Sequence, residues 1–496
     1  MEKEKIKNWL KEPFNLALLG VLIFAVGIRL YYFSFTLGQG LWWDEAAYGS
    51  LAKNIMHGGI WDATDLIIGE KGIRPPLFPL IWGFLVSIGF GESAVRFLLE
   101  FVPSVIAVFF VYLIGREFYG KKVGLISTAI FSVLWIHLFY TGRLLTNVPA
   151  LSLLFPSIYL FSKALKTENG INGKYFAFSL ILAALATIVR YPVGLIFFVY
   201  LGFLILTLRT DLLKEKKFWI SGIFGMIPLW IFFLINYVRV GNIFPALLGS
   251  DYVQVVNEKI GFYVLNFIPT YLTTTFFVTF LIGLVIVVLE LFLGYDQIRK
   301  SQKLRGHLLL LLLFIAVYGY FVFYLRGAED RWLMPASLAL VIFSGYGMGK
   351  IQDFLKKYGK KFSSLIVILL LVWGAYAQIN FANDLIENRS TSFLQLRQGF
   401  EWIKENSAED SKILGAGIQA YSIYYAERGY VSFTSNESDT EELAKETDYL
   451  VLHGFTKPPE FVERYVQENQ DKWALANVFF FDEAKTQPAF IVYRKI

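Results

Sequence analysis

The sequence predicts a polytopic α-helical membrane protein that ends in a water-soluble, extracytoplasmic α/β domain. Of its 496 residues, 56% are apolar and only 17% are charged, whereas soluble proteins carry about a quarter charged residues. Many apolar runs approach or exceed the roughly 20 residues that cross a bilayer. After Asn383 the composition becomes polar and the apolar runs shorten. Cysteine is absent, which excludes disulfides and thiolate chemistry.

About eleven transmembrane helices are expected in the first 384 residues. The N-terminal apolar run is too long for a signal peptide and no small-residue cleavage site follows it, so it is interpreted as a retained first span. The expected spans lie near 14–35, 94–115, 123–141, 147–163, 174–190, 192–208, 218–238, 263–293, 307–325, 332–349 and 363–382. The overlong span at 263–293 is expected to tilt or to project from the membrane.

The charge between the spans predicts the topology. Lysine and arginine concentrate in alternate gaps, for example at 116–122 and 350–361, as cytoplasmic loops do. The alternation holds only if the apolar segment 77–90 does not cross, and Pro75 and Pro76 in front of it favour a re-entrant or interfacial helix. We therefore expect a multi-pass protein of the plasma membrane with a cytoplasmic N-terminus and an extracytoplasmic C-terminal domain.

Two domains are expected. Residues 1–384 form the membrane domain, with a large first outer loop at 36–93, and residues 385–496 form the outer α/β domain. Strands are expected in 411–419, 448–455, 474–481 and 489–496, and helices in 399–406, 441–447 and 458–470. Strands that alternate with helices are typical of a small α/β domain. The tyrosine-rich stretch 421–430 fits either sugar stacking or core packing.

Two adjacent carboxylates, Asp44 and Glu45, stand in the first outer loop. The residues that follow, 45–56, have helical spacing and are expected to lie in the membrane surface. Three tryptophans of the loop are expected at headgroup depth: Trp42, Trp43 and Trp61. Asp44 is either the N-cap of this helix or a functional carboxylate, and the pair alone leaves both open.

Five arginines lie at the expected outer ends of apolar segments, where the positive-inside rule disfavours cations. They are Arg74, Arg96, Arg143, Arg190 and Arg331. Any one of them could snorkel to the interface or pair with an acid, the nearest being Glu92, Glu100 and Asp330. Five on one face, together with two carboxylates, predict a site for an anionic group and a reacting hydroxyl, because guanidinium groups suit phosphate oxygens.

Other chemistry has little support. His57 and His453 lack metal-like spacing, and the motifs of zinc proteases, phosphate-binding loops and serine hydrolases are absent. Three classes of function remain: a transferase, a transporter or flippase of a phosphorylated polar lipid, and a sensor or scaffold. A transporter is expected to carry charges in mid-span or on both faces, whereas here they crowd one face.

The order of these features resembles the polyprenyl-phosphate-dependent glycosyltransferases of the GT-C superfamily, in the branch of protein O-mannosyltransferases and lipid A aminoarabinose transferases. The resemblance rests on the Asp-Glu pair and on the later segments RPPLFPLIW, YTGRLLTNVPALSLL, TIVRYPVGLI and EDRWLMPASLAL. It implies a GT-C fold and the inverting transfer of a single sugar, hexose or pentose, from a polyprenyl or dolichyl phosphate. The acceptor would be a hydroxyl of a protein, glycan or glycolipid on the outer face.

The resemblance also implies roles for the candidate residues. Asp44 takes the proton of the acceptor hydroxyl, and Glu45 orients Asp44 or binds the acceptor. Arg74 and Arg331 contact the donor phosphate. The remaining arginines are further candidates for the phosphate, with packing roles also open: Arg96, Arg143 and Arg190.

At three positions the chain departs from the family. Ile73 and Ala47 stand where aminoarabinose transferases have an acid and an arginine, and Asn147 stands where many relatives have aspartate. These changes argue against aminoarabinose specificity and a bound metal. No cofactor is expected to be required, and the use of a divalent metal is left open. The expected partners are the lipid-linked sugar, the acceptor and membrane lipid, with no nucleic acid.

Overall fold

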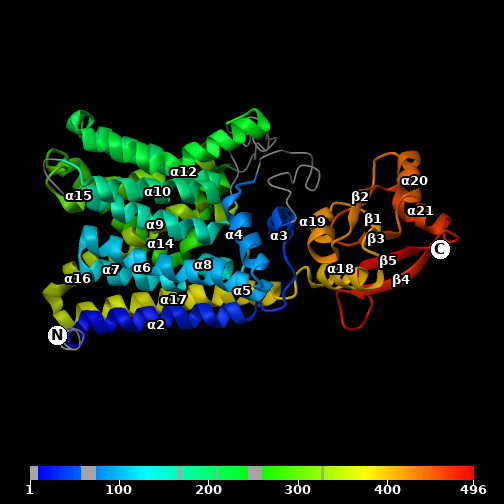
Figure 1. Cartoon of the computed structure of the whole chain (residues 1–496). Coiled ribbons are helices and arrows are strands. Elements are labelled where there is room, and N and C mark those ends of the chain that lie inside the picture. Colours follow the sequence, from blue (N-terminus) through cyan, green and yellow to red (C-terminus); the bar gives the residue numbers. More distant parts are fainter. Residues whose placement is uncertain (1–8, 57–73, 166–169, 208–209, 244–259, 325–328) are drawn as a thin grey trace. The chain divides into compact units, whose positions relative to one another are not determined.

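The computed structural model describes residues 9–56, 74–165, 170–207, 210–243, 260–324 and 329–496 (Figure 1). His57, Trp61 and Ile73, which the sequence analysis named, lie outside this set. Contacts between residues divide the chain into two compact units. The first unit holds 1–35, 73–77 and 96–387, and the second holds 36–72, 78–95 and 388–496. Each unit is described by itself.

The first unit is helical. Its main helices are α2 (Pro13–Ser34), α6 (Val102–Tyr119), α7 (Lys121–Val133), α8 (Trp135–Tyr140), α9 (Asn147–Ala164), α10 (Gly173–Val189), α11 (Leu195–Leu206), α12 (Lys216–Val240), α14 (Ile260–Gly294), α15 (Gln302–Gly319), α16 (Ser337–Leu355) and α17 (Lys360–Arg389). In Figure 1, α2 and α17 run side by side, and the Tyr32 hydroxyl of α2 donates to Asn383 Oδ1 of α17 at 2.5 Å. Every predicted span falls on helical structure.

Two predicted spans are interrupted. The span expected at 123–141 breaks at Leu134, whose backbone is extended, into α7 and α8. The overlong span at 263–293 contains Thr273 at φ 57°, so α14 is two helical pieces that meet at this residue. A single sequence does not show such breaks, because neither Leu134 nor Thr273 is a glycine or proline.

Among the described helices long enough to cross a membrane, α16 is the most enclosed, with 94% of its apolar stretch buried. It is apolar all round, as a fully enclosed helix must be. Glycines let its neighbours approach, as is common between membrane helices. A Cβ at Gly347 would lie 2.1 Å from the Thr279 carbonyl oxygen of α14, and one at Gly345 would lie 2.3 Å from Ser127 Oγ of α7.

The outer helices present apolar side chains to their surroundings. Only 17% of the apolar stretch of α12 is buried, and Trp230 and Leu234 on it are more than half exposed. Soluble proteins rarely expose contiguous apolar surface on this scale. Within the described residues, seven helices are long and apolar enough to cross a membrane. The chain is therefore a multi-pass membrane protein, and the orientation of its termini stays a prediction.

The segment expected not to cross forms α4 (Leu77–Ser87), of 11 residues. At 1.5 Å per residue this helix is about 16 Å long, well short of the roughly 30 Å hydrocarbon core. Its length agrees with a re-entrant or interfacial helix. The next turn, α5 (Glu92–Arg96), leads into α6 through a π-helical turn, η1 (Phe97–Phe101).

The second unit contains a five-stranded sheet in the order β2-β1-β3-β5-β4. Its strands are β1 (Lys412–Gly415), β2 (Gly429–Ser432), β3 (Tyr449–His453), β4 (Trp473–Phe480) and β5 (Pro488–Lys495). β1 is parallel to β2 and β3, and β5 is antiparallel to β3 and β4. The helices are α3 (Trp43–Met56), α18 (Leu394–Asn406), α19 (Gln419–Tyr421), α20 (Glu437–Lys445) and α21 (Phe461–Glu468), with the π-turn η9 (Ser422–Ala426).

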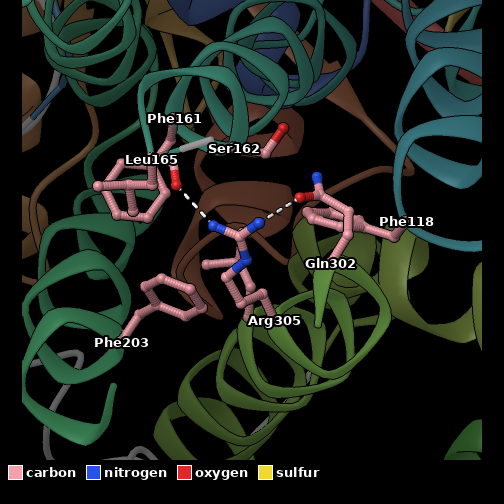
Figure 2. Close-up of a pocket in the computed structure, with 8 residues that line it drawn as sticks. Phe118, Phe161, Ser162, Leu165, Phe203, Gln302 and Arg305 are labelled. Atoms are coloured by element: carbon pink, nitrogen blue, oxygen red, sulfur yellow. Dashed lines mark hydrogen bonds between the residues drawn. The ribbon is translucent and has the colours of Figure 1, made fainter. Parts of the chain in front are cut away.

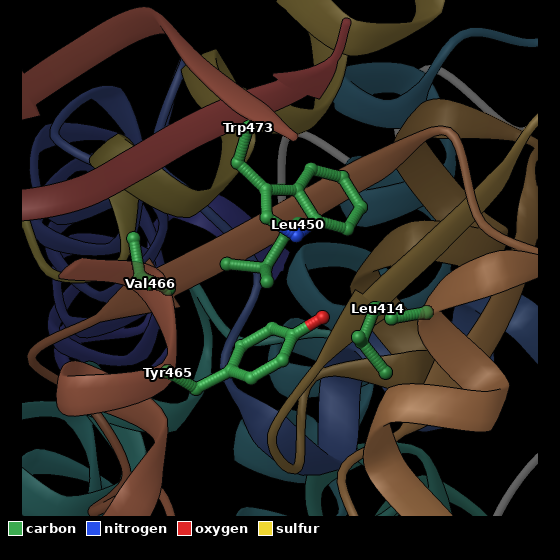
Figure 3. Packing of buried hydrophobic residues seen from close by; sticks show 6 residues of the cluster. Leu414, Leu450, Tyr465, Val466 and Trp473 are labelled. Carbon is green, nitrogen blue, oxygen red and sulfur yellow. The ribbon is translucent and has the colours of Figure 1, made fainter. Parts of the chain in front are cut away.

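The predicted strands and helices of the C-terminal α/β region are confirmed, and β2, a four-residue strand at one edge, was missed. The core is built where α21 covers the sheet (Figure 3). Leu414 of β1 and Leu450 of β3 pack there with Tyr465, Val466 and Trp473. Short edge strands carry little apolar periodicity, which explains why the pattern did not show β2.

The first outer loop was assigned to the membrane domain from sequence. By packing, its residues 36–56 and 78–93 belong to the second unit with the C-terminal region, whereas 74–77 belong to the first unit. α3 lies close to α4, since a Cβ at Gly83 would meet the Ala52 carbonyl oxygen at 2.7 Å. The predicted domain boundary at 384/385 stays a prediction, but the loop helix and the C-terminal sheet share one packing unit.

Candidate active site

The two carboxylates of the first loop have different surroundings. α3 begins at Trp43, and the Trp42 carbonyl accepts the first helical bond from Ala46 N–H at 2.7 Å, so Trp42 is the N-cap. Glu45 is fully buried, and its Oε2 accepts a bond from Trp42 N–H at 2.6 Å. This is the returning half of a capping box.

The interpretation of Asp44 as the N-cap is therefore wrong. Asp44 is the second residue of the helix, and its side chain is half-buried whereas Glu45 is enclosed. A carboxylate in the first helical turn interacts favourably with the positive end of the helix dipole. The two adjacent carboxylates therefore differ: Glu45 caps the helix, whereas Asp44 stays partly exposed.

In the first unit, the turn that connects α8 with α9 gathers the predicted arginines. Arg143 belongs to this turn and is 2% exposed. Arg96 is also buried, and its Nη1 donates to the Gly142 carbonyl at 2.7 Å. Arg190 Nη1 donates to Thr146 Oγ1 at 3.3 Å. Three of the five guanidiniums therefore lie in, or bond to, one stretch of six residues.

The other two arginines are tied to the same region through their backbones. Asn147 Nδ2, at the start of α9, donates to the Arg331 carbonyl at 2.9 Å. The hydroxyl of Tyr191, the neighbour of Arg190, donates to the Arg74 carbonyl at 3.3 Å. The structure thus places the backbones of Arg74 and Arg331 beside residues that adjoin the turn.

Acidic groups also lie in this region. Asp330 Oδ1 accepts from Tyr140 OH at 3.2 Å and from Arg331 N–H at 2.8 Å, and Glu329 accepts from the Arg331 side chain. Buried Glu100 accepts from Leu145 N–H at 3.0 Å. Arginines and carboxylates therefore occur together in this region.

The π-turn η1 explains how two side chains near one helix start, Arg96 and Glu100, both bond to the turn between α8 and α9. Pro103 has no N–H to offer the Leu99 carbonyl, which favours a wider turn at this point. π-Turns change the direction in which side chains project and often occur at functional sites. Here the turn places Arg96 and Glu100 on the same stretch, 142–145.

Sequence reasoning missed Arg29 on α2, which is buried like Arg96 and Arg143. Its Nε donates to Ser104 Oγ at 2.7 Å and its Nη1 to the Ser132 carbonyl at 2.9 Å. These bonds link α2 to α6 and α7, which is a packing role. It also missed Thr146, Tyr140 and Tyr191, for which a single sequence carries no signal.

A separate pocket lies at the opposite end of α9 (Figure 2). Its lining includes Phe161, Phe203 and Arg305. α9 spans about 25 Å between this pocket and the arginine-rich turn. Figure 2 shows the Arg305 guanidinium bonded to the Leu165 carbonyl and to Gln302 Oε1, both at 2.5 Å. Arg305 therefore ties helix ends together, and none of the predicted site residues lines this pocket.

No group of three His, Asp or Glu side chains that could hold a metal ion occurs in the described parts of the chain. His453 Nε2 bonds the Ala416 carbonyl at 2.7 Å, and burial lowers the pKa of its imidazole. A neutral, bonded histidine of this kind is a packing residue.

Known proteins resemble this arrangement. Residues 73–235 match the family model described as dolichyl-phosphate-mannose-protein mannosyltransferase. Among solved structures, the fold is similar to ArnT from Cupriavidus metallidurans bound to undecaprenyl phosphate, with a TM-score of 0.63, 11% identity, and 95% of this chain and 98% of that chain covered. The Archaeoglobus fulgidus oligosaccharyltransferase in its apo form gives a TM-score of 0.62 at 12% identity, covering 90% of this chain and 70% of that chain.

The chain has the fold of the GT-C glycosyltransferases. Arabinofuranosyltransferase AftD from Mycobacteria shares it as well, with a TM-score of 0.54, 12% identity, and 95% of this chain and 41% of that chain covered. No curated sequence matches the chain. The predicted resemblance to the GT-C superfamily is confirmed, and no comparison supports the transporter alternative.

The part of the chain that matches the family model includes the arginine-rich turn between α8 and α9. The stretch 73–235 that matches the mannosyltransferase model contains four of the five arginines, all except Arg331. Asp44 and Glu45 precede that stretch and belong to the second unit. The roles of these residues stay predictions.

Proposed function

We propose that this GT-C protein is a membrane glycosyltransferase that moves a single sugar from a polyprenyl phosphate to a hydroxyl acceptor. The observation that carries the proposal is the turn between α8 and α9 in a fold shared with lipid-phosphate-dependent transferases. The side chains of Arg96, Arg143 and Arg190 lie in this turn or bond to it. The backbones of Arg74 and Arg331 are bonded to residues that adjoin it. Guanidinium groups bind phosphate oxygens through paired donors.

The proposed reaction is one inverting displacement. The acceptor oxygen attacks the anomeric carbon, and its proton passes to the Asp44 carboxylate. The bond between the anomeric carbon and the phosphate oxygen breaks, and its electron pair stays on the phosphate. The guanidiniums stabilise that charge, and the products are the glycosylated acceptor and polyprenyl phosphate. Arg74 and Arg331 are the first phosphate contacts that we propose.

Two neighbours support the donor class. ArnT from Cupriavidus metallidurans was solved with undecaprenyl phosphate, and AglB from Archaeoglobus fulgidus with dolichol-phosphate and an inhibitory peptide. We propose a hexose or pentose as the sugar and a hydroxyl of a protein, glycan or glycolipid as the acceptor. The site would face outward from the plasma membrane, with the N-terminus in the cytoplasm. Transfer is proposed to need no metal.

Asp44→Asn tests the base. With purified protein in nanodiscs and dolichyl phosphate mannose as donor, we expect transfer to fall by about 10²- to 10⁴-fold while donor binding persists, because a proton acceptor is lost. The control is Asp410→Asn, at an exposed carboxylate of the C-terminal α/β region. Full transfer by Asp44→Asn would show that Asp44 is not the base.

Arg74→Gln tests the phosphate site in the same preparation. If the half-buried Arg74 guanidinium contacts the phosphate, its loss should raise the donor dissociation constant about tenfold or more. The control is Arg464→Gln, at an exposed arginine on α21. Unchanged donor affinity in Arg74→Gln would remove Arg74 from the proposed phosphate site.

A further inference from the structure

We propose that the C-terminal α/β region positions the helix that carries Asp44, and that Tyr425, Lys53 and Glu427 are the positioning residues. The inference rests on the proposed function, because it takes Asp44 as the base. All of the contacts that carry it lie within the second packing unit. They fall at the entry of α3, along its first turn and near its end.

The entry of α3 is held by Tyr425 of η9. The Leu41 N–H, one residue before the N-cap, donates to the Tyr425 hydroxyl at 3.0 Å, and Leu41 is fully buried. Two residues earlier, the Gln39 side-chain amide donates to the Arg389 carbonyl at 2.5 Å. These bonds determine where the chain turns into α3, three residues before Asp44.

The first turn of α3 is held by aromatic rings. Trp43, next to Asp44, meets Tyr421 edge-on at 5.4 Å and Phe393 at 5.7 Å between ring centroids. Phe393 adopts a left-handed backbone at φ 61°, which is unusual for a bulky residue. Strain of this kind persists only where surrounding contacts enforce it. Gly40 allows the close approach, since a Cβ there would lie 2.3 Å from the Phe393 carbonyl oxygen.

The other end of α3 is held by charge. Lys53 Nζ bonds the Tyr424 carbonyl and the Glu427 carboxylate. Glu427 also pairs with Lys404 at 2.7 Å. Burial acts to raise the pKa of Glu427, but the two ammonium partners outweigh it and hold that pKa at about 2. Burial lowers the pKa of Lys53, although Glu427 and, more weakly, Glu92 act to raise it.

These contacts matter because α3 is too short to orient itself. Isolated helices below about 12–15 residues are marginal in water, and α3 has 14 residues. From Trp43 to Lys53 the helix rises about 15 Å, so anchors at both ends determine its direction and its rotation. A misplacement of about 1 Å can cost a reaction about 10²-fold. The C-terminal region thus sets the position of Asp44 without touching the substrate.

Tyr425→Phe tests the entry contact, and Tyr449→Phe is its matched control. The Tyr449 hydroxyl donates to the Asn406 carbonyl at 2.6 Å inside the same region, away from α3. Both variants lose one buried hydroxyl. The free energy of one hydrogen bond corresponds to a change of about 2- to 10-fold in rate. We therefore expect kcat for transfer to fall by that factor in Tyr425→Phe alone. The donor KM should stay unchanged in both variants.

Lys53→Met tests the second anchor, with Lys53→Arg as the conservative rescue. We expect kcat to fall about 10-fold or more in Lys53→Met, because the anchor at the end of α3 is removed, and to return to within about 3-fold of wild type in Lys53→Arg. Lys412→Met is the control, since Lys412 pairs with Glu446 at 3.4 Å away from α3.

The outcomes separate the two proposals. Equal losses of kcat in Tyr425→Phe and Tyr449→Phe would show a general effect on the fold and overturn the inference. Wild-type kcat in both Tyr425→Phe and Lys53→Met, with Asp44→Asn inactive, would also overturn it and leave the proposed function standing. Full activity of Asp44→Asn would instead refute the choice of base.

Discussion

Substitutions at Glu45 can distinguish its role as a cap of α3 from a role in the proposed transfer reaction. Its buried Oε2 lies 2.6 Å from the Trp42 nitrogen. A bond from an N–H to a charged group is worth about 1.5–3 kcal/mol and a neutral bond about 0.5–1.5 kcal/mol. Glu45→Gln keeps an oxygen acceptor and should lose about 1 kcal/mol. Glu45→Ala leaves a partly buried N–H without this acceptor and should lose about 1–3 kcal/mol.

If this bond holds the first turn of α3 in its reactive form, the rate of transfer should fall as the free energy of the bond is lost. About 1 kcal/mol corresponds to about 5-fold and 3 kcal/mol to about 150-fold in rate. We therefore expect kcat to decrease in the order wild type, Glu45→Gln, Glu45→Ala and Asp44→Asn. Amide hydrogen exchange over 42–48 should accelerate in Glu45→Ala and change little in Glu45→Gln. Glu441→Gln, at an exposed position on α20, is the control.

The refuting result is specific. A Glu45→Gln variant as inactive as Asp44→Asn, with unchanged hydrogen exchange in the first turn, would show that the charge of Glu45 takes part in the reaction. Loss of the cap cannot explain a decrease of 10³-fold or more, because the upper value of about 3 kcal/mol corresponds to only about 150-fold. Glu45 would then be a second reacting carboxylate.

Two further predictions concern the packing of the helices and the metal. Gly347→Ala should destabilise the protein by about 1–3 kcal/mol, since its Cβ would lie 2.1 Å from the Thr279 carbonyl, whereas Gly222→Ala meets nothing within 4 Å and should be neutral or stabilising; equal thermal unfolding of both variants in detergent would contradict this close packing. Treatment with EDTA should leave transfer unchanged, because in the proposed reaction guanidiniums supply the positive charge beside the phosphate. Activity lost to EDTA and restored by Mg²⁺ or Mn²⁺ would show that a metal is required.

Much of the fold was predictable because a bilayer sets the length of what crosses it. The α2, α10 and α12 spans are read from uninterrupted apolar runs, and α4 was separated from them by its length and by the charge pattern. The strands β3 and β5 follow from short runs of β-branched and aromatic residues between polar segments. The five arginines were selected by the same reasoning, since a cation is costly where they stand.

The sequence by itself thus determined a membrane-embedded helical protein and its polar C-terminal α/β region, and it supplied the candidate residues of the proposed phosphate site, because hydropathy and charge are local properties of the chain. Only the tertiary structure decided that Glu45 and not Asp44 caps α3, that a π-turn directs Arg96 and Glu100 to one stretch, and that α3 packs with Tyr425 and Glu427. Such contacts join residues far apart in sequence or depend on single side-chain rotamers, and the period of a helix or a strand carries no information about either.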